Sequence, residues 1–266
     1  MSFIKLENFE LFYEIHGAGE PLVLISGFAS GAWIWYRQVE YLAKDFKVIT
    51  FDPRGVGQTK ISAETPVSIE AIANDTAKLL DELGIERANL LGASFGGFVA
   101  QQYAIKYPEK LQKLILACTS FGGANHVAPD MEVLASFAPQ PGANSSERVR
   151  RFMLPAFTKE YAAQNPDEIE KVCALREAND VPDAVYLQQL TAATTFDTEN
   201  RLSGIQAKTL VLTGDRDLVV PPQNSKNIAE IIPDSRLEIV EGGSHMFFIE
   251  NADKFNSSVK EFLLNY

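Results

Sequence analysis

Cysteine is scarce in this sequence of 266 residues, and neither cysteine belongs to a recognisable motif. Cys118 and Cys173 lie far apart and have no metal-binding spacing, which favours buried free thiols in a reducing compartment. No apolar stretch approaches the roughly 18 residues that a membrane span requires. The first seven residues carry charges where a signal peptide needs an apolar segment. We therefore expect a cytoplasmic protein without a membrane partner.

Positive charge is also in short supply. The chain has 24 Lys and Arg against 35 Asp and Glu, a formal net charge of -11. Such a surface repels phosphate backbones, so nucleic acid is not an expected partner. The one basic cluster is Arg148, Arg150 and Arg151, beside Glu147, and we interpret it as a solvated helix face. The sequence makes no prediction of the oligomeric state.

Apolar residues make up 46% of the chain, enough for a single α/β domain with a substantial core. Short apolar runs alternate with helical patterns, which is typical of a mostly parallel sheet flanked by helices. The first two runs are close enough to form an antiparallel hairpin. The predicted strands cover residues 4–7, 10–16, 22–26, 47–51, 88–93, 113–118, 209–213 and 236–240.

Between these runs the sequence predicts helices. Ser68 can cap one that ends before Gly84, and another begins directly after Ser94 and stops at Pro108. Further helices are expected at residues 33–43, 224–231 and 252–264.

The alternation breaks at residues 121–202, which contain helical patterns and several prolines but no convincing strand. We interpret this stretch as a helical cap inserted into a core formed by residues 1–120 and 203–266. The cap is expected to close over the functional site and to supply part of an apolar pocket. The residues predicted to line that pocket are Trp33, Phe121, Phe137 and Phe247.

The strongest chemical signal is GASFG at residues 92–96, placed between a predicted strand and a predicted helix. G-x-S-x-G in this context is a nucleophile elbow, where a tight turn leaves no room for side chains at the positions two residues before and two residues after the serine. Phosphate-binding loops are the alternative. Glycines at 92, 96 and 97 do not match G-x-G-x-x-G, and no Gly-Lys-Ser/Thr follows. The pattern therefore predicts Ser94 as a nucleophile.

A serine hydroxyl needs a base, and the chain has only three histidines. His16 precedes an early turn and His126 lies in the predicted cap, whereas His245 follows the last strand on a glycine-rich loop. Loops at the carboxyl ends of parallel strands are where α/β sheets place their sites, so His245 is the predicted base. The loop after the preceding strand offers Asp215 or Asp217 as the acid that orients it, and spacing alone leaves the two open.

At this point the sequence resembles the α/β-hydrolase superfamily over essentially its whole length. Residues 52–59 (DPRGVGQT) are similar to the family's D-x-R-G-x-G-x-S/T loop, and residues 243–246 are similar to its histidine loop. In the segment 214–221 the resemblance places the family's acid on Asp217 rather than Asp215. It implies the α/β-hydrolase fold, with a mostly parallel eight-stranded sheet, and a triad of Ser94, Asp217 and His245.

One position departs from the family pattern. The family commonly has His-Gly after its third strand, where this chain has Ser26 and Gly27. The resemblance implies an oxyanion hole formed by the backbone N–H groups of Phe28 and Phe95, which survive a side-chain replacement. Enol-lactone hydrolases of the family also often lack that histidine, which favours lactones.

The activity implied is hydrolysis of a small or medium carboxylic ester or lactone through an acyl-enzyme on Ser94, with no metal or organic cofactor. Relatives that open epoxides or remove halides use an aspartate in place of the serine and are not expected. Carbon–carbon bond hydrolysis and cofactor-free haloperoxidase (perhydrolase) chemistry share this triad and remain alternatives. A ligand-binding signal receptor on the same fold is an alternative from another class.

Overall fold

The computed structural model describes residues 2–138 and 144–265. Its centre is one eight-stranded sheet with the order β1-β2-β4-β3-β5-β6-β7-β8, in which all pairs from β4 onward are parallel. The predicted fold class is thereby confirmed. The strands are β1 (Ser2–Lys5), β2 (Glu10–His16), β3 (Glu20–Ile25), β4 (Phe46–Phe51), β5 (Ala88–Ala93), β6 (Leu111–Ala117), β7 (Lys208–Gly214) and β8 (Ser235–Val240).

The sheet begins antiparallel, as the closely spaced first two strands predicted. β1 pairs with β2, and β2 pairs antiparallel with β4. The first strand ends earlier than expected, at Lys5, because Leu6 already belongs to the turn, where its N–H donates to the carbonyl of Phe9 at 2.9 Å.

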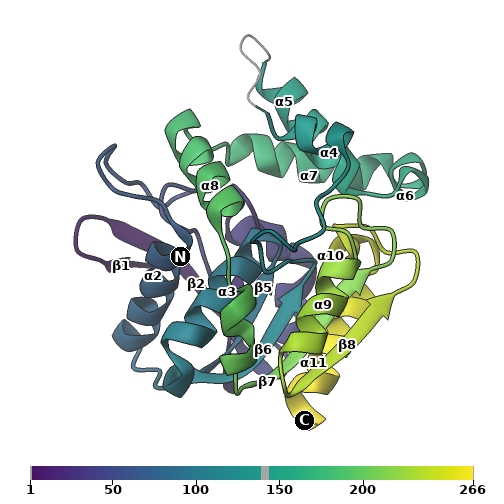
Figure 1. The fold of residues 1–266 in the computed structure, drawn as a ribbon. Helices are drawn as coiled ribbons and strands as arrows, with labels where there is room; N and C mark the ends of the chain where they lie inside the picture. Colours follow the sequence, from purple (N-terminus) through teal and green to yellow (C-terminus); the bar gives the residue numbers. More distant parts are fainter. Residues whose placement is uncertain (1, 139–143, 266) are drawn as a thin grey trace.

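Helices cover both faces of the sheet (Figure 1). Alternate residues of a strand point to opposite faces, so Leu24 packs into one core and Val23 and Ile25 into the other. One face carries α2 (Ile69–Glu82), α3 (Phe95–Lys106) and α9 (Gln223–Ile231), and the other carries α1 (Tyr36–Leu42) and α11 (Ala252–Asn265). The predicted helix at 33–43 is divided into the 3-10 turn η1 (Ala32–Trp35) and α1.

The residues predicted to begin and end α2 and α3 do so in the structure. The Ser68 hydroxyl accepts the N–H of Ala71 at 3.1 Å at the start of α2, and Gly84 beyond its end has φ 66°. α3 follows Ser94 directly and ends before the short 3-10 turn η2 (Pro108–Lys110).

In the described residues between β6 and β7 there are five α-helices, which gather beyond the end of the sheet towards which β8 points (Figure 1). The two ends of this segment meet, because Thr198 N–H donates to Phe121 O and Gly123 N–H donates to Phe196 O, each at 2.9 Å. The helices are α4 (Met131–Ser136), α5 (Ser145–Met153), α6 (Lys159–Gln164), α7 (Pro166–Ala178) and α8 (Asp183–Thr195), with 3-10 turns η3 (Leu154–Ala156) and η4 (Glu199–Gly204). Within the described ranges, none of the helices has the length and apolarity to cross a bilayer.

Candidate active site

Ser94 lies at a sharp turn between β5 and α3, with φ 54° and ψ -121°. A non-glycine residue rarely adopts a positive φ, and such strain is typical of functional positions. The flanking glycines permit the turn: a Cβ on Gly92 would lie 2.2 Å from the carbonyl oxygen of Gly96, and one on Gly96 would lie 2.1 Å from that of Ile25. The turn therefore has the geometry expected of a nucleophile elbow.

Asp217 lies on the loop after β7, and His245 lies on the loop after β8. The two loops are neighbours at the carboxyl end of the sheet. His245 Nδ1 lies 2.8 Å from Asp217 Oδ2, and both side chains are buried. The other carboxylate oxygen of Asp217 accepts the N–H groups of Val219 and Val220, each at 2.8 Å. The loop after β7 thus fixes the carboxylate, and the carboxylate orients the imidazole so that Nε2 is its free nitrogen.

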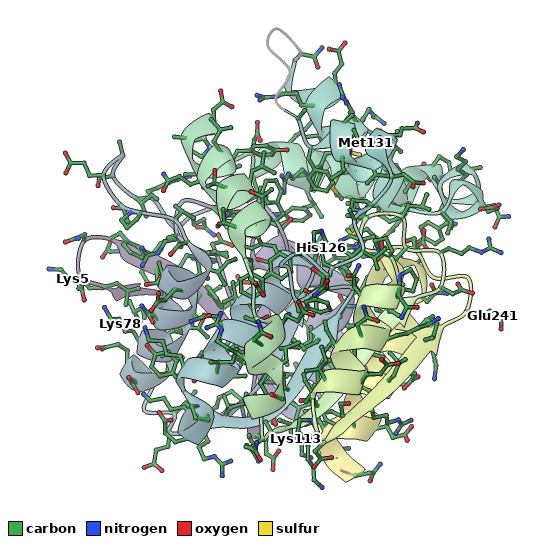
Figure 2. All side chains as sticks on the ribbon, in the orientation of Figure 1. Lys5, Lys78, Lys113, His126, Met131 and Glu241 are labelled. Atoms are coloured by element: carbon green, nitrogen blue, oxygen red, sulfur yellow. The ribbon has the colours of Figure 1, made fainter. Side chains whose placement is uncertain are left out.

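The residues that the sequence offered as alternatives to Asp217 and His245 make different contacts. The Asp215 carboxylate accepts the N–H of Gly242 at 2.7 Å, an exposed contact between two loops. His16 lies beside Glu14 on the second strand. His126 Nδ1 lies 2.7 Å from the carbonyl oxygen of Gly123 and is exposed on the loop between β6 and the cap (Figure 2). Of the three histidines, only His245 lines a cavity together with Ser94.

Ser94 and His245 line one cavity of about 50 Å³ under the cap. The two side chains do not hydrogen-bond to each other among the described contacts. Contacts of this kind are often long in ligand-free enzymes and tighten when substrate binds. Apart from Ser30, the other side chains of the cavity walls are apolar, which strengthens electrostatic interactions with a reacting carbonyl.

Two backbone N–H groups remain available beside Ser94. Phe95 is the first residue of α3, where a helix offers its N–H no acceptor, and the N–H of Phe28 donates to no described residue. Both residues are buried. Two desolvated donors near one serine are the arrangement that an oxyanion needs, and the N-terminal end of α3 adds a favourable dipole.

The loop that carries Phe28 is held by the cap, which the sequence did not indicate. Arg176 of α7 donates through Nη1 to the carbonyl oxygens of Phe28 (3.2 Å) and Ala29 and to Ser30 Oγ (3.1 Å). Gln189 of α8 accepts the Ala29 N–H at 2.7 Å, and Ala29 itself has φ 47°. No local motif marks either residue, because their partners are mostly backbone atoms and all lie more than a hundred residues away.

Ser26, at the position where the family commonly has a histidine, takes part in the same loop. Its hydroxyl donates to the carbonyl oxygen of Ser30 at 2.5 Å. This bond closes the turn from within, so the loop is braced by a short polar side chain on one side and by the cap on the other.

The predicted pocket residues are only partly brought together. Phe137 lines the cavity at Ser94. The structure corrects the prediction for the other three, which do not line it. Phe121 and Phe247 are fully buried, the latter packed on Phe255 at the start of α11, and Trp33 faces a surface groove beside Glu14. Trp35, Phe152 and Met153 also line it, together with residues that the sequence did not single out, which include Ile34, Val219, Met246 and Phe248.

Cys118, Asp217 and His245 lie close enough for one metal ion, with candidate ligand atoms within 4.8 Å of one another. The donor set does not fit a metal well. Burial, with the nearby Asp217 carboxylate, raises the pKa of the Cys118 thiol well above its usual value, whereas a metal needs the thiolate. Asp217 also already holds His245 Nδ1. The group is better suited to orienting the imidazole.

Comparison with known proteins agrees with this geometry. A protein of Azorhizobium caulinodans named "Putative carbamate hydrolase RutD" is 30% identical over 253 residues, 95% of this chain and 94% of that protein. The enol-lactonase from Burkholderia xenovorans LB400 has a TM-score of 0.87 at 26% identity, covering 98% of this chain and 99% of its own. A thermophilic esterase from Thermogutta terrifontis, with malate bound, has a TM-score of 0.83 at 28% identity, covering 99% and 98%. The family model for the alpha/beta hydrolase fold matches residues 20–252, and the chain belongs to that family.

Proposed function

We propose that this protein is a serine hydrolase that cleaves a small or medium carboxylic ester or lactone through an acyl-enzyme on Ser94. One observation carries the proposal: a strained serine and a carboxylate-oriented histidine open into a single small cavity, with two free backbone donors beside the serine. The match to the hydrolase family supports a hydrolytic activity.

The first half-reaction transfers the acyl group to the enzyme. His245 Nε2 takes the proton of the Ser94 hydroxyl as Oγ bonds to the carbonyl carbon. The oxyanion accepts hydrogen bonds from the N–H groups of Phe28 and Phe95. When the tetrahedral intermediate collapses, the C–O bond to the leaving alcohol breaks, and the alcohol takes the proton from His245.

The second half-reaction returns the enzyme to its starting state. His245 takes a proton from a water molecule, whose oxygen attacks the acyl carbon. The Ser94 ester bond breaks, Ser94 recovers its proton from His245, and the carboxylic acid is released. Asp217 stays ionised throughout and stabilises the imidazolium that forms in each half.

Esters, lactones and carbamates all present a carbonyl carbon bonded to oxygen, so this machinery suits each of them. The relatives include one named for carbamate hydrolysis, one enol-lactonase and one esterase. We place this chain with esters and lactones, because its cavity at Ser94 is small and apolar.

The test is a panel of aryl esters, lactones and aryl carbamates of graded acyl length, assayed with the wild-type protein and with Ser94→Ala. We expect turnover of at least one ester or lactone, an initial burst of aryl alcohol, and loss of both in Ser94→Ala. Wild type as inert as Ser94→Ala across the panel would contradict the proposal and favour a ligand-binding receptor. Turnover of carbamates alone would contradict the ester and lactone assignment.

A further inference from the structure

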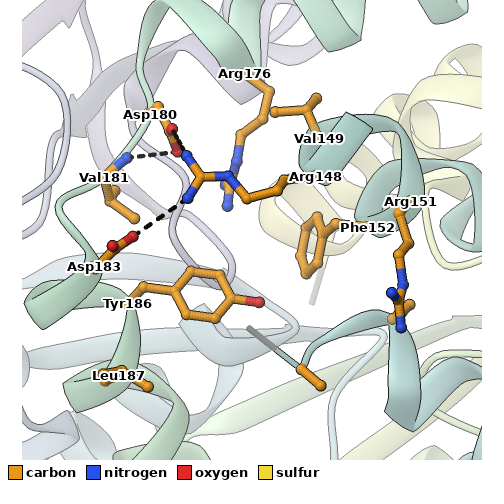
Figure 3. Close-up of a pocket in the computed structure, with 12 residues that line it drawn as sticks. Arg148, Val149, Arg151, Phe152, Arg176, Asp180, Val181, Asp183, Tyr186 and Leu187 are labelled. Carbon is orange, nitrogen blue, oxygen red and sulfur yellow. Dashed lines mark hydrogen bonds and ion pairs between the residues drawn. The ribbon is translucent and has the colours of Figure 1, made fainter. Parts of the chain in front are cut away.

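A second cavity lies within the cap, next to the one at Ser94. Its volume is about 320 Å³, and it is lined from α4, α5, α7, α8 and the turn between α7 and α8 (Figure 3). Phe152 lines both cavities, and the ring of Phe28, which lines the smaller one, lies 4.8 Å from that of Tyr186, which lines the larger. The two cavities therefore adjoin at the aromatic side chains of Phe28, Phe152 and Tyr186.

Three arginines line the cap cavity, and their partners differ. Arg148 is neutralised, because Nη2 lies 3.0 Å from the Asp180 carboxylate and Nη1 lies 3.4 Å from that of Asp183 (Figure 3). Arg151 donates to the carbonyl oxygen of Ala135 at the edge of the cavity. Arg176 is the buried member, with 3% of its surface exposed.

No ion pair of Arg176 is found among the described contacts, and residues 139–143 contain no acidic side chain. Burial lowers the pKa of Arg176, and the charge of Asp180, which is paired with Arg148, raises it in part. Its three acceptors are the neutral oxygens on the Phe28 loop, and all three are held by Nη1. Nε and Nη2 donate to no described residue, while the Phe152 ring lies 5.0 Å from the guanidinium carbon.

Burying a cation without a directly bonded counter-ion is unfavourable, and the Asp180 charge offsets only part of this cost, because the pKa of Arg176 stays lowered. Burial lowers the pKa of Arg176 to about 10, so the guanidinium still carries its charge at neutral pH. The protein has a net charge of -11, so its overall electric field does not attract anions. Any preference for an anionic ligand must therefore come from a local positive charge, and Arg176 supplies one at this cavity.

We propose that the cap cavity binds a carboxylate on the acyl chain of the substrate and that this carboxylate pairs with Arg176. The substrates would then be half-esters of dicarboxylic acids, or lactones that carry an acid side chain. This inference rests on the proposed hydrolase function and narrows its substrate class. Arg and carboxylate form charge-assisted hydrogen bonds through two N–H groups at once, and Arg176 has such groups left over.

The dimensions suit such a substrate. The cavity of about 50 Å³ at Ser94 holds little more than the reacting carbonyl and a methylene or two, so a longer acyl chain must extend towards the cap. The Phe28 N–H, which is the proposed oxyanion donor, and the Ala29 carbonyl, which accepts from Arg176, are separated by at most about 7 Å of chain. A carboxylate a few methylenes from the ester carbonyl spans this separation.

The decisive experiment compares charged and neutral acyl chains of the same shape. The substrates are 4-nitrophenyl half-esters of succinate, glutarate and adipate, each paired with the ester in which CH(CH3)2 replaces the carboxylate, after subtraction of spontaneous hydrolysis. We expect kcat/KM to favour the best half-ester over its neutral partner by about 10- to 150-fold, as for a hydrogen bond to a charged group. Arg176→Gln should bring that ratio to about one.

Arg150→Gln is the matched control, since Arg150 lies on α5 and pairs with Glu170. This substitution also removes one positive charge, and it should leave unchanged the ratio of kcat/KM for each half-ester to that for its neutral partner. If Arg176→Gln lowers kcat/KM equally for both members of each pair, Arg176 only holds the Phe28 loop and the inference is overturned. A wild-type ratio near one overturns it without any variant, should Arg176→Gln fail to fold.

A measurement of adipate binding distinguishes failure of the proposed carboxylate site from failure of the proposed hydrolase activity. We expect adipate to bind Ser94→Ala in calorimetry and to bind Ser94→Ala/Arg176→Gln at least tenfold more weakly. Such binding without hydrolysis of any ester would overturn the hydrolase proposal and keep the carboxylate site. Hydrolysis of neutral and charged esters at equal rates, with no adipate binding, would overturn the carboxylate site and keep the hydrolase.

Discussion

At the scale of single residues, Asp217 differs from Asp215 in what its carboxylate contacts. Asp217 holds His245 Nδ1 and two backbone N–H groups and is buried, whereas Asp215 holds one N–H at the surface. We expect Asp217→Asn to lower kcat by roughly 10⁴-fold, because an amide at Oδ2 would favour the wrong imidazole tautomer. Asp215→Asn, measured with the same aryl ester, should stay within about twofold of wild type. Similar losses in both variants would contradict the assignment of the acid.

The glycines of the elbow give a second prediction at this scale. In Gly96→Ala the new Cβ would lie 2.1 Å from the Ile25 carbonyl oxygen, so backbone must move. We expect the free energy of unfolding, measured in urea, to fall by about 1–3 kcal/mol or more. Gly204→Ala is the control, since a Cβ there meets nothing within 4 Å. Equal losses of stability in the two variants would show that the close approach of the Ile25 carbonyl does not exclude a side chain at residue 96.

At the scale of elements, the loop after β4 is fastened to α2 by a buried ion pair. Arg54 donates through Nε and Nη2 to the two oxygens of Asp75, each at 2.7 Å, and the Asp75 side chain is 3% exposed. Arg54→Met leaves that carboxylate buried without its partner. We expect the free energy of unfolding at neutral pH to fall by about 3 kcal/mol, measured by urea denaturation.

The effect of Arg54→Met should depend on pH. Burial raises the pKa of Asp75 and the hydrogen bonds from Arg54 oppose that rise, so the pKa climbs further in the variant. The folded variant then binds a proton more readily than the unfolded chain, and its stability increases relative to wild type as pH falls towards 5. The double variant Arg54→Met/Asp75→Leu should be more stable than Arg54→Met at neutral pH. A pH-independent difference would contradict this account.

The sequence predicted these elements unevenly, for physical reasons. The tight turn at Ser94 and the meeting of Asp217 and His245 could both be inferred, because they depend on local turn chemistry and on the carboxyl ends of parallel strands lying at one end of the sheet. Arg176 and Gln189 could not, since their partners are carbonyl and amide groups on the Phe28 loop that no side-chain pattern records. Trp33 failed as a pocket residue because hydrophobicity does not specify which way a side chain in η1 points.

At the scale of the whole molecule, the cap is bonded to the core at several points, and only some of these can affect the reaction. Gln189 of α8 accepts the N–H of Ala29, next to the proposed oxyanion donor Phe28. Its neighbour Gln188 accepts the N–H of Val67 at 2.8 Å, far along the chain from that loop. The two glutamines therefore make the same kind of cap-to-core hydrogen bond with different consequences.

We expect Gln189→Ala to lower kcat by roughly 10- to 100-fold with little change in KM for a small neutral ester. The Ala29 N–H would lose its buried acceptor, the strained loop would relax, and displacement of the Phe28 N–H by even 1 Å costs rate at this order. Gln188→Ala should lower the melting temperature by a similar amount and leave kcat within about twofold of wild type. If both variants lose stability and neither loses kcat, the cap covers the site without shaping its oxyanion hole.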